Sequence, residues 1–94
     1  MTELESLRTE LDAIDRELAV LFEKRMGVAR RIADVKRREG LSVLDSSREE
    51  QVLSSRAALI GEEALREPAR ALWKELMRLS REEQQRWMEA QTPC

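Results

Sequence analysis

Two long cationic side chains in the N-terminal half of the sequence have a spacing that suits an anionic ligand. Arg25 stands where the apolar pattern calls for an apolar residue, between Leu21 and Val28. Lys36 follows eleven residues later, about three helical turns, which places both side chains on one helix face about 16 Å apart. A buried guanidinium without a partner is costly. We therefore expect Arg25 to form an internal salt bridge, to extend past the apolar residues to solvent, or to bind an anionic ligand. Lys36 either reaches the same ligand or is an ordinary solvated lysine.

A second group of polar residues would lie on a helix in the C-terminal half. Four residues spaced by four form one helical stripe, namely Leu72, Leu76, Ser80 and Gln84. The stripe begins apolar and ends polar, so Ser80 and Gln84 would be neighbours one turn apart. Either this polar end passes into solvent, or both side chains line a pocket.

Asp45, Arg48 and Glu49 form a third group, at the expected start of another helix. A helix N-terminus offers free backbone N–H groups and a positive potential, and both favour anions. These residues either cap the helix only, or cap it and also contribute to a ligand site.

Arg8 is separated from Arg25 by 17 residues, which is about 25 Å along one helix. Taken alone, Arg8 is an ordinary surface arginine, because it cannot share a small-molecule site with Arg25 of the same chain. In an antiparallel pair of such helices, Arg8 of one chain would approach the half of the other that carries Arg25 and Lys36. Two-fold symmetry would then create two equal sites.

The composition excludes several classes of function. The chain has no histidine, and its single cysteine is Cys94, the last residue, which we expect to be inert. A Ser/His/Asp triad, a Cys/His pair and histidine metal ligands are thereby excluded. The 17 basic and 19 acidic residues leave no positive excess for nucleic acid or an anionic membrane surface. No apolar run approaches a membrane span of about 18 residues, and no apolar signal core is present, so a cytoplasmic location is expected.

The first element that must position these residues is a long helix over about residues 4–38. Apolar residues recur there in alternating steps of three and four, which defines an apolar seam formed by Leu4, Leu7, Leu11, Ile14, Leu18, Leu21, Val28, Ile32 and Val35. Gly40 marks its end. Such a helix is about 50 Å long, whereas a compact domain of this size has a radius of gyration of about 12 Å. The helix therefore projects from its own chain, and a second copy is the simplest cover for its seam.

Two further helices complete an all-α chain with a single domain over residues 1–94. A helix over about residues 46–60 begins with Ser46 or Asp45 as its cap; with Ser46, Glu49 would complete a capping box. A third helix covers about residues 66–90, with Pro68 in its first turn.

In combination, these features resemble the all-helical class of chorismate mutase. The resemblance extends from about Leu4 to Gln84, and its motifs occur in the expected order. They are Leu7-Arg8, Ile14-Asp15, Arg25 in Glu23-Lys24-Arg25, Lys36 in Val35-Lys36, Asp45-Ser46-Ser47-Arg48-Glu49, and Ser80-Arg81-Glu82-Glu83-Gln84. No single motif is specific, but the ordered set is.

The resemblance implies an intertwined antiparallel homodimer with two sites, each using Arg8 from the second chain. It implies the conversion of chorismate, a dicarboxylate, to prephenate in aromatic amino acid biosynthesis, by a unimolecular rearrangement without metal or organic cofactor. Lys36 and Gln84 would be the catalytic donors to the ether oxygen. The implied substrate-binding residues are Arg8, Arg25, Asp45, Arg48, Glu49 and Ser80.

Three other functions remain compatible with the same residues. An isochorismate pyruvate lyase would use a similar set on a related dianion, and the segment Gly40–Ser47 is the region where the two would differ. A regulatory form of the domain, associated or fused with another shikimate-pathway enzyme, is the second alternative. The third is a coiled-coil interaction module, which predicts a carboxylate partner for Arg25 and no pocket.

Overall fold

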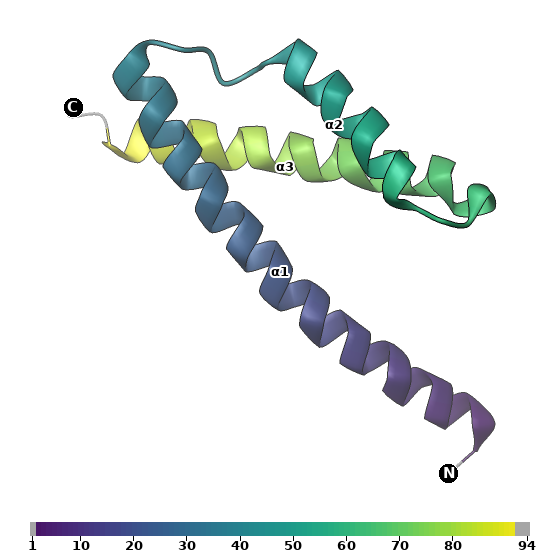
Figure 1. Ribbon diagram of the computed structural model, residues 1–94. Helices are drawn as coiled ribbons and strands as arrows, with labels where there is room; N and C mark the ends of the chain where they lie inside the picture. Colours follow the sequence, from purple (N-terminus) through teal and green to yellow (C-terminus); the bar gives the residue numbers. More distant parts are fainter. Residues whose placement is uncertain (1, 92–94) are drawn as a thin grey trace.

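Three helices make up nearly all of the protein in the computed structural model, which describes residues 2–91. They are α1 (Glu3–Glu39), α2 (Ser46–Leu59) and α3 (Arg66–Gln91), with a short 3-10 helix, η1 (Glu63–Leu65), before α3 (Figure 1). The described residues include no strand, which confirms the all-α prediction. Cys94 lies outside them. None of the helices in this range is both long and apolar enough to cross a membrane.

Local sequence signals explain where α1 begins and ends. The side chain of Thr2 accepts a hydrogen bond from the backbone N–H of Glu5, and the Glu5 carboxylate accepts one from the backbone N–H of Thr2. This capping box satisfies two of the free donors at the helix start. At the other end, Gly40 has a φ of 70°, a left-handed conformation that glycine adopts without steric cost.

The start of α2 is set by Asp45. Its Oδ1 accepts a hydrogen bond of 3.0 Å from the backbone N–H of Arg48. Ser46 is the first residue inside the helix, so the capping box with Ser46 as the cap is wrong and the alternative with Asp45 is confirmed. An aspartate at this position also places a negative charge at the positive end of the helix dipole.

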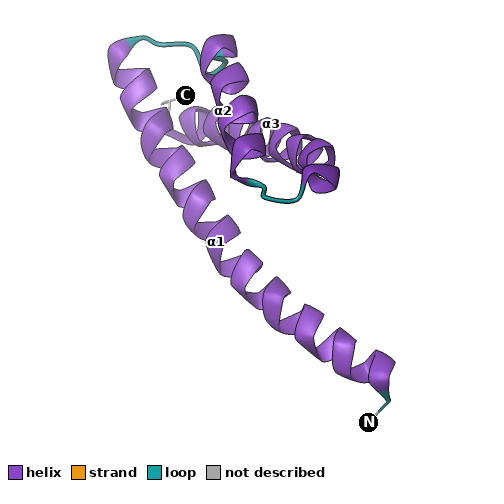
Figure 2. Ribbon diagram, turned by 45° about the vertical axis from the view of Figure 1, so that its right-hand side comes forward, coloured by secondary structure: helices purple, strands orange, loops and turns teal. Residues whose placement is uncertain are grey.

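α3 is the shared support of the fold, since α1 and α2 both pack on it and no Cα of α1 lies within 8 Å of a Cα of α2. Figures 1 and 2 show α2 lying along α3 while the C-terminal part of α1 crosses the other half of α3. Against α2, α3 packs through a small core of Val52, Leu53 and Met77, joined by Trp73. In α1 the buried residues are Ala29 and Ala33, and their small side chains suit a close helix crossing.

The N-terminal half of α1 extends away from the other helices (Figure 1). The radius of gyration is 17.0 Å, well above the value of about 12 Å for a compact chain of this length. Along this half the seam residues are more than half exposed, at 53–58%; they are Leu4, Leu7, Leu11, Ile14, Leu18 and Leu21. Even Val28, Ile32 and Val35 remain 38–44% exposed. The seam therefore stays open along the whole helix in one chain.

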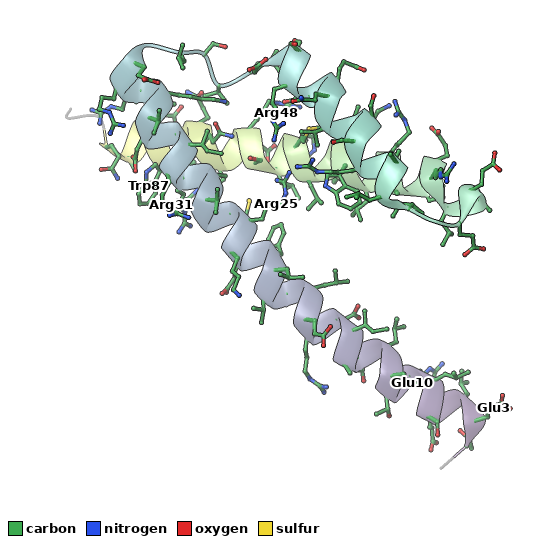
Figure 3. The ribbon with its side chains drawn as sticks, viewed as in Figure 1. Glu3, Glu10, Arg25, Arg31, Arg48 and Trp87 are labelled. Carbon is green, nitrogen blue, oxygen red and sulfur yellow. The ribbon has the colours of Figure 1, made fainter. Side chains whose placement is uncertain are left out.

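A buried carboxylate fastens α1 to α3 where they cross. Glu83 of α3 is 9% exposed and forms ion pairs with Arg30 of α1 and Arg86 of its own helix. Burial raises the pKa of Glu83, but the hydrogen bonds and positive charges of Arg86 and Arg30 outweigh burial and leave this pKa lowered. Nearby, the Nε1 of Trp87 donates to Asp34 at 2.9 Å, and Figure 3 shows Trp87 at this crossing.

Glu83→Gln is expected to lower the free energy of unfolding by about 1–2 kcal/mol, because two charge-assisted contacts are lost while both arginines keep access to solvent. Since the pKa is lowered on folding, this contribution is present above the ordinary glutamate pKa and is lost as the pH falls through the folded value. Urea unfolding at pH 7 and at pH 3 measures it, and the difference between wild type and variant should shrink at pH 3. Glu82→Gln is the control, as that exposed carboxylate pairs only with Arg78 within α3; an equal loss in both variants would contradict the prediction.

Candidate functional site

A pocket of about 510 Å³ lies between the C-terminal half of α1, the start of α2 and the middle of α3. Its volume is in the range of small-molecule sites. Seven of the eight residues proposed from the sequence line it: Arg25, Lys36, Asp45, Arg48, Glu49, Ser80 and Gln84. Arg8 does not. In Figure 3, Arg25 on α1 and Arg48 on α2 lie on either side of this space.

Lys36, Gln84 and Ser80 form a connected hydrogen-bond chain on one wall of the pocket. The Lys36 Nζ donates to the backbone carbonyl of Val43 at 2.7 Å and to the Oε1 of Gln84 at 3.1 Å. The Nε2 of Gln84 in turn donates to the Oγ of Ser80 at 3.1 Å. Because Lys36 occupies the amide oxygen, the NH₂ group of Gln84 is directed to the other side and keeps a second proton to donate. This wall therefore presents an ammonium group and an oriented amide donor.

The polar end of the α3 stripe is its buried end. Gln84 is 6% exposed, whereas Leu72 at the apolar end is 53% exposed. Of the two possibilities for the stripe, passage into solvent is therefore wrong, and both Ser80 and Gln84 line the pocket. A buried amide requires hydrogen-bond partners, and Lys36 and Ser80 supply them.

Arg25 has no carboxylate partner among the described residues, although it is partly buried. Burial lowers the pKa of Arg25, and the nearby positive charges of Arg56 and Arg48 lower it further. The predicted internal salt bridge of Arg25 is thus absent within residues 2–91. A pocket, which a simple coiled-coil interaction module would lack, is present. A cation surrounded by cations is an arrangement that an anionic ligand would stabilise.

The three residues at the start of α2 have different partners. Asp45 caps the helix, as described above, and the Nη1 of Arg48 donates to the Oε1 of Gln51 at 2.7 Å. Both carboxylate oxygens of Glu49 accept from the Nη1 of Arg81 on α3, at 2.5 and 2.6 Å. Of this group, only Glu49 is joined to another helix by an ion pair.

The pocket also contains three cations that the sequence interpretation did not assign to it, Lys24, Arg56 and Arg81. Helical spacing contained a signal for two of them. Arg56 is seven residues beyond Glu49, and Arg81 is four beyond Met77, which places each on the face of a residue that lines the pocket. Nothing in the sequence distinguishes Lys24 from a solvated lysine.

Charge and shape together define the ligand that would fit. Six cationic side chains line the pocket against two carboxylates, Asp45 and Glu49, and the remaining wall is mostly apolar. The cations are Lys24, Arg25, Lys36, Arg48, Arg56 and Arg81. A guanidinium binds carboxylate in a planar, bidentate fashion. The pocket is therefore suited to a small, partly apolar molecule with more than one carboxylate.

Arg8 lies on the projecting half of α1, about 25 Å along the helix axis from Arg25. Figure 3 shows Glu3 and Glu10, which flank it in sequence, at the far end of α1 from the pocket. No side chain of one chain can bridge that separation. If Arg8 belongs to a site, the site lies on another copy.

Comparison with known proteins gives two matches. The sequence profile of the family described as chorismate mutase type II matches residues 7–85. The T-protein of Haemophilus influenzae is 39% identical over 56 residues, which are 60% of this chain and 15% of that relative. The matched residues thus span only a small part of that relative's length. No solved structure gives a significant match.

Proposed function

Since the chain belongs to the chorismate mutase type II family, a family of isomerases in aromatic amino acid biosynthesis, we propose that it converts chorismate to prephenate in the pocket described above. The observation that carries the proposal is the lining of this pocket, where an unpaired Arg25, an ammonium group and an oriented amide face one cavity. Chorismate is a small dicarboxylate with an apolar ring, which is the ligand chemistry that the pocket favours.

The bond changes of this reaction need no nucleophile, general acid or general base from the protein. One C–O bond of the ether breaks while one C–C bond forms within the same molecule, so no atom or proton is exchanged with the protein. Negative charge develops on the ether oxygen in the transition state. Catalysis then consists of donors placed at that oxygen and of holding a flexible substrate in its compact, reactive conformation.

Lys36 and Gln84 are the donors that we place on the ether oxygen. They are hydrogen-bonded to each other and are further fixed by Val43 and Ser80. A preorganised donor stabilises developing charge without reorganisation during the reaction. The half-buried position of Lys36 and the buried position of Gln84 reduce competition from water.

The remaining residues would bind the rest of the substrate. Arg25 takes a carboxylate, since it has no anionic partner in the part of the chain that the structure describes, and Ser80 assists at a carboxylate. Glu49 accepts a hydrogen bond from the ring hydroxyl near the backbone of Asp45. Arg48 contributes positive potential at the N-terminus of α2.

We further propose that the active form is an antiparallel homodimer in which the projecting halves of α1 cover each other's seam. Leaving six large apolar side chains more than half exposed is costly in water, and a second copy offers a matching surface by two-fold symmetry. The same arrangement carries Arg8 across to the partner's pocket, where it would meet the second carboxylate.

The test is an assay of the purified chain with chorismate and, separately, with isochorismate. We expect chorismate to be consumed and prephenate to appear in equal amount, far above the rate without protein, and no pyruvate to form from isochorismate. Pyruvate release from isochorismate without prephenate from chorismate would instead establish a lyase. Absence of turnover by the isolated chain would favour a regulatory domain.

A further inference from the structure

We propose that Arg81 is a positioning residue of this site, which holds the Glu49 carboxylate at the ring-hydroxyl position and away from the cations that bind substrate. The proposal rests on the function proposed above, because it assigns a role to Arg81 through Glu49. Arg81 itself is not placed on the reacting atoms.

The contact between the two side chains is close and is the only ion pair that joins α2 to α3 in residues 2–91. The Nη1 of Arg81 donates to both oxygens of Glu49, at 2.5 and 2.6 Å. The side chains are 33% and 25% exposed, respectively. Hydrogen bonds to both oxygens fix the direction of the Glu49 carboxylate as well as its distance from Arg81. Rotation about the last side-chain bond of Glu49 would break one of the two contacts.

The location of this pair makes the direction of Glu49 consequential. Glu49 and Arg81 line both the site pocket and a second hollow of about 480 Å³ between α2 and α3, so they form part of the wall between the two. A carboxylate on that wall can face either space. Among residues 2–91, the ion pair that Glu49 forms is the one with Arg81 of α3, so this contact determines which of the two spaces Glu49 faces.

Without Arg81, the Glu49 carboxylate would have other cations to pair with. Within the described range, residues 2–91, Arg25 has no carboxylate partner, and Lys36 and Arg48 have only neutral acceptors. Each of them lines the same pocket. Opposite charges in a partly dehydrated pocket attract strongly, so an untethered Glu49 would compete with the substrate's carboxylates for these cations. Arg81 prevents that competition because it forms an ion pair with Glu49.

The experiment is a double-mutant cycle on the full chain with Arg81→Met, Glu49→Gln and the double variant, measuring kcat and KM for chorismate. We expect Arg81→Met to lower kcat/KM by about 10- to 100-fold, mainly through KM, since a small misplacement in a site has effects of this size. In the Glu49→Gln background the same change should cost less than about two-fold, because residues that act through one another are not additive. Arg81→Lys, which keeps the cation, should recover part of the loss.

Arg78→Met is the matched control, since Arg78 is one turn away on α3, pairs only with Glu75 and Glu82, and lies outside the site pocket. It should leave kcat and KM unchanged. Equal losses of kcat/KM from Arg81→Met in both backgrounds would overturn the inference. It would also be overturned if Arg81→Met and Arg81→Lys lowered kcat/KM equally and both lowered the melting temperature, because the loss would then reflect stability. A wild-type chain without chorismate turnover would overturn the proposed function instead, and the inference with it.

Discussion

Lys36→Met is expected to lower kcat for chorismate by about 10²–10³-fold, the usual cost of removing one preorganised donor from a developing oxyanion. Lys36 has two functions in the proposed site. Its ammonium group faces the ether oxygen, and its hydrogen bond to the Oε1 of Gln84 keeps the NH₂ group of that amide directed toward the site. Methionine preserves the length and the apolar stem of the side chain but abolishes both effects. The fall should be in kcat more than in KM, because the charge on the ether oxygen exists only in the transition state.

Arg38→Met provides the matched control for this variant. Arg38 lies in the same last turn of α1, so both changes remove one cation from the C-terminal end of the helix dipole. Arg38 is exposed and does not line the pocket. Steady-state kinetics should therefore show near wild-type turnover for Arg38→Met, and circular dichroism should show equal helix content in both variants. A Lys36→Met protein with unchanged kcat would rule out the proposed donor.

The lengths of the helices were accessible from the sequence because their signals are local. The alternating seam and Gly40 predict α1 over about residues 4–38, and the helix is found at Glu3–Glu39. The choice between Asp45 and Ser46 as cap of α2 was not accessible, since both are good capping residues and only the position of the backbone distinguishes them. The short η1 helix had no recognisable signal.

The packing of the helices was less accessible than their lengths. The seam draws attention to large residues such as Ile32 and Val35, yet the residues of α1 buried within one chain are Ala29 and Ala33. Alanine gives a weak pattern, because it is common on buried and exposed faces of helices alike. The seam remains open at 38–58% exposure, which is consistent with a surface that another chain covers.

The same limit applies to the pocket. Residues at breaks in an apolar pattern, such as Arg25 and Gln84, stand out in the sequence, and the structure brings them to one cavity. Arg81 lies within a charged stretch, and Arg56 stands between serines and alanines. In both settings, a cation that faces a neighbouring helix looks the same as one that faces water. Helical spacing places each of them on the face of a residue that lines the pocket, but assigning them to the pocket also required the positions of α2 and α3 relative to each other.

A mixture of two inactive variants is expected to recover activity if Arg8 completes the site of the partner chain. Arg8→Ala and Lys36→Met should each lower turnover by about 10²-fold or more, because each removes a charged contact to the substrate. In a mixed dimer, the site built on the Arg8→Ala chain has its own Lys36 and receives Arg8 from the other chain. That site is fully wild type, while the second site lacks both groups. Random pairing of equal amounts makes about half of the dimers mixed, each with one intact site of two, so about a quarter of wild-type activity should return.

The mixing experiment has a control that isolates the crossing of Arg8. Lys36→Met and Gln84→Ala affect two residues that contact each other within one chain, so each site of their mixed dimer keeps one defect and the mixture should remain inactive. Both mixtures are refolded together from denaturant, because intertwined chains exchange slowly, and their mass is measured by sedimentation. Recovery in the first mixture alone requires a dimer whose sites are shared through Arg8. A mass of one chain, or no recovery in the first mixture, would remove Arg8 from the site and leave the open seam of α1 to a different partner.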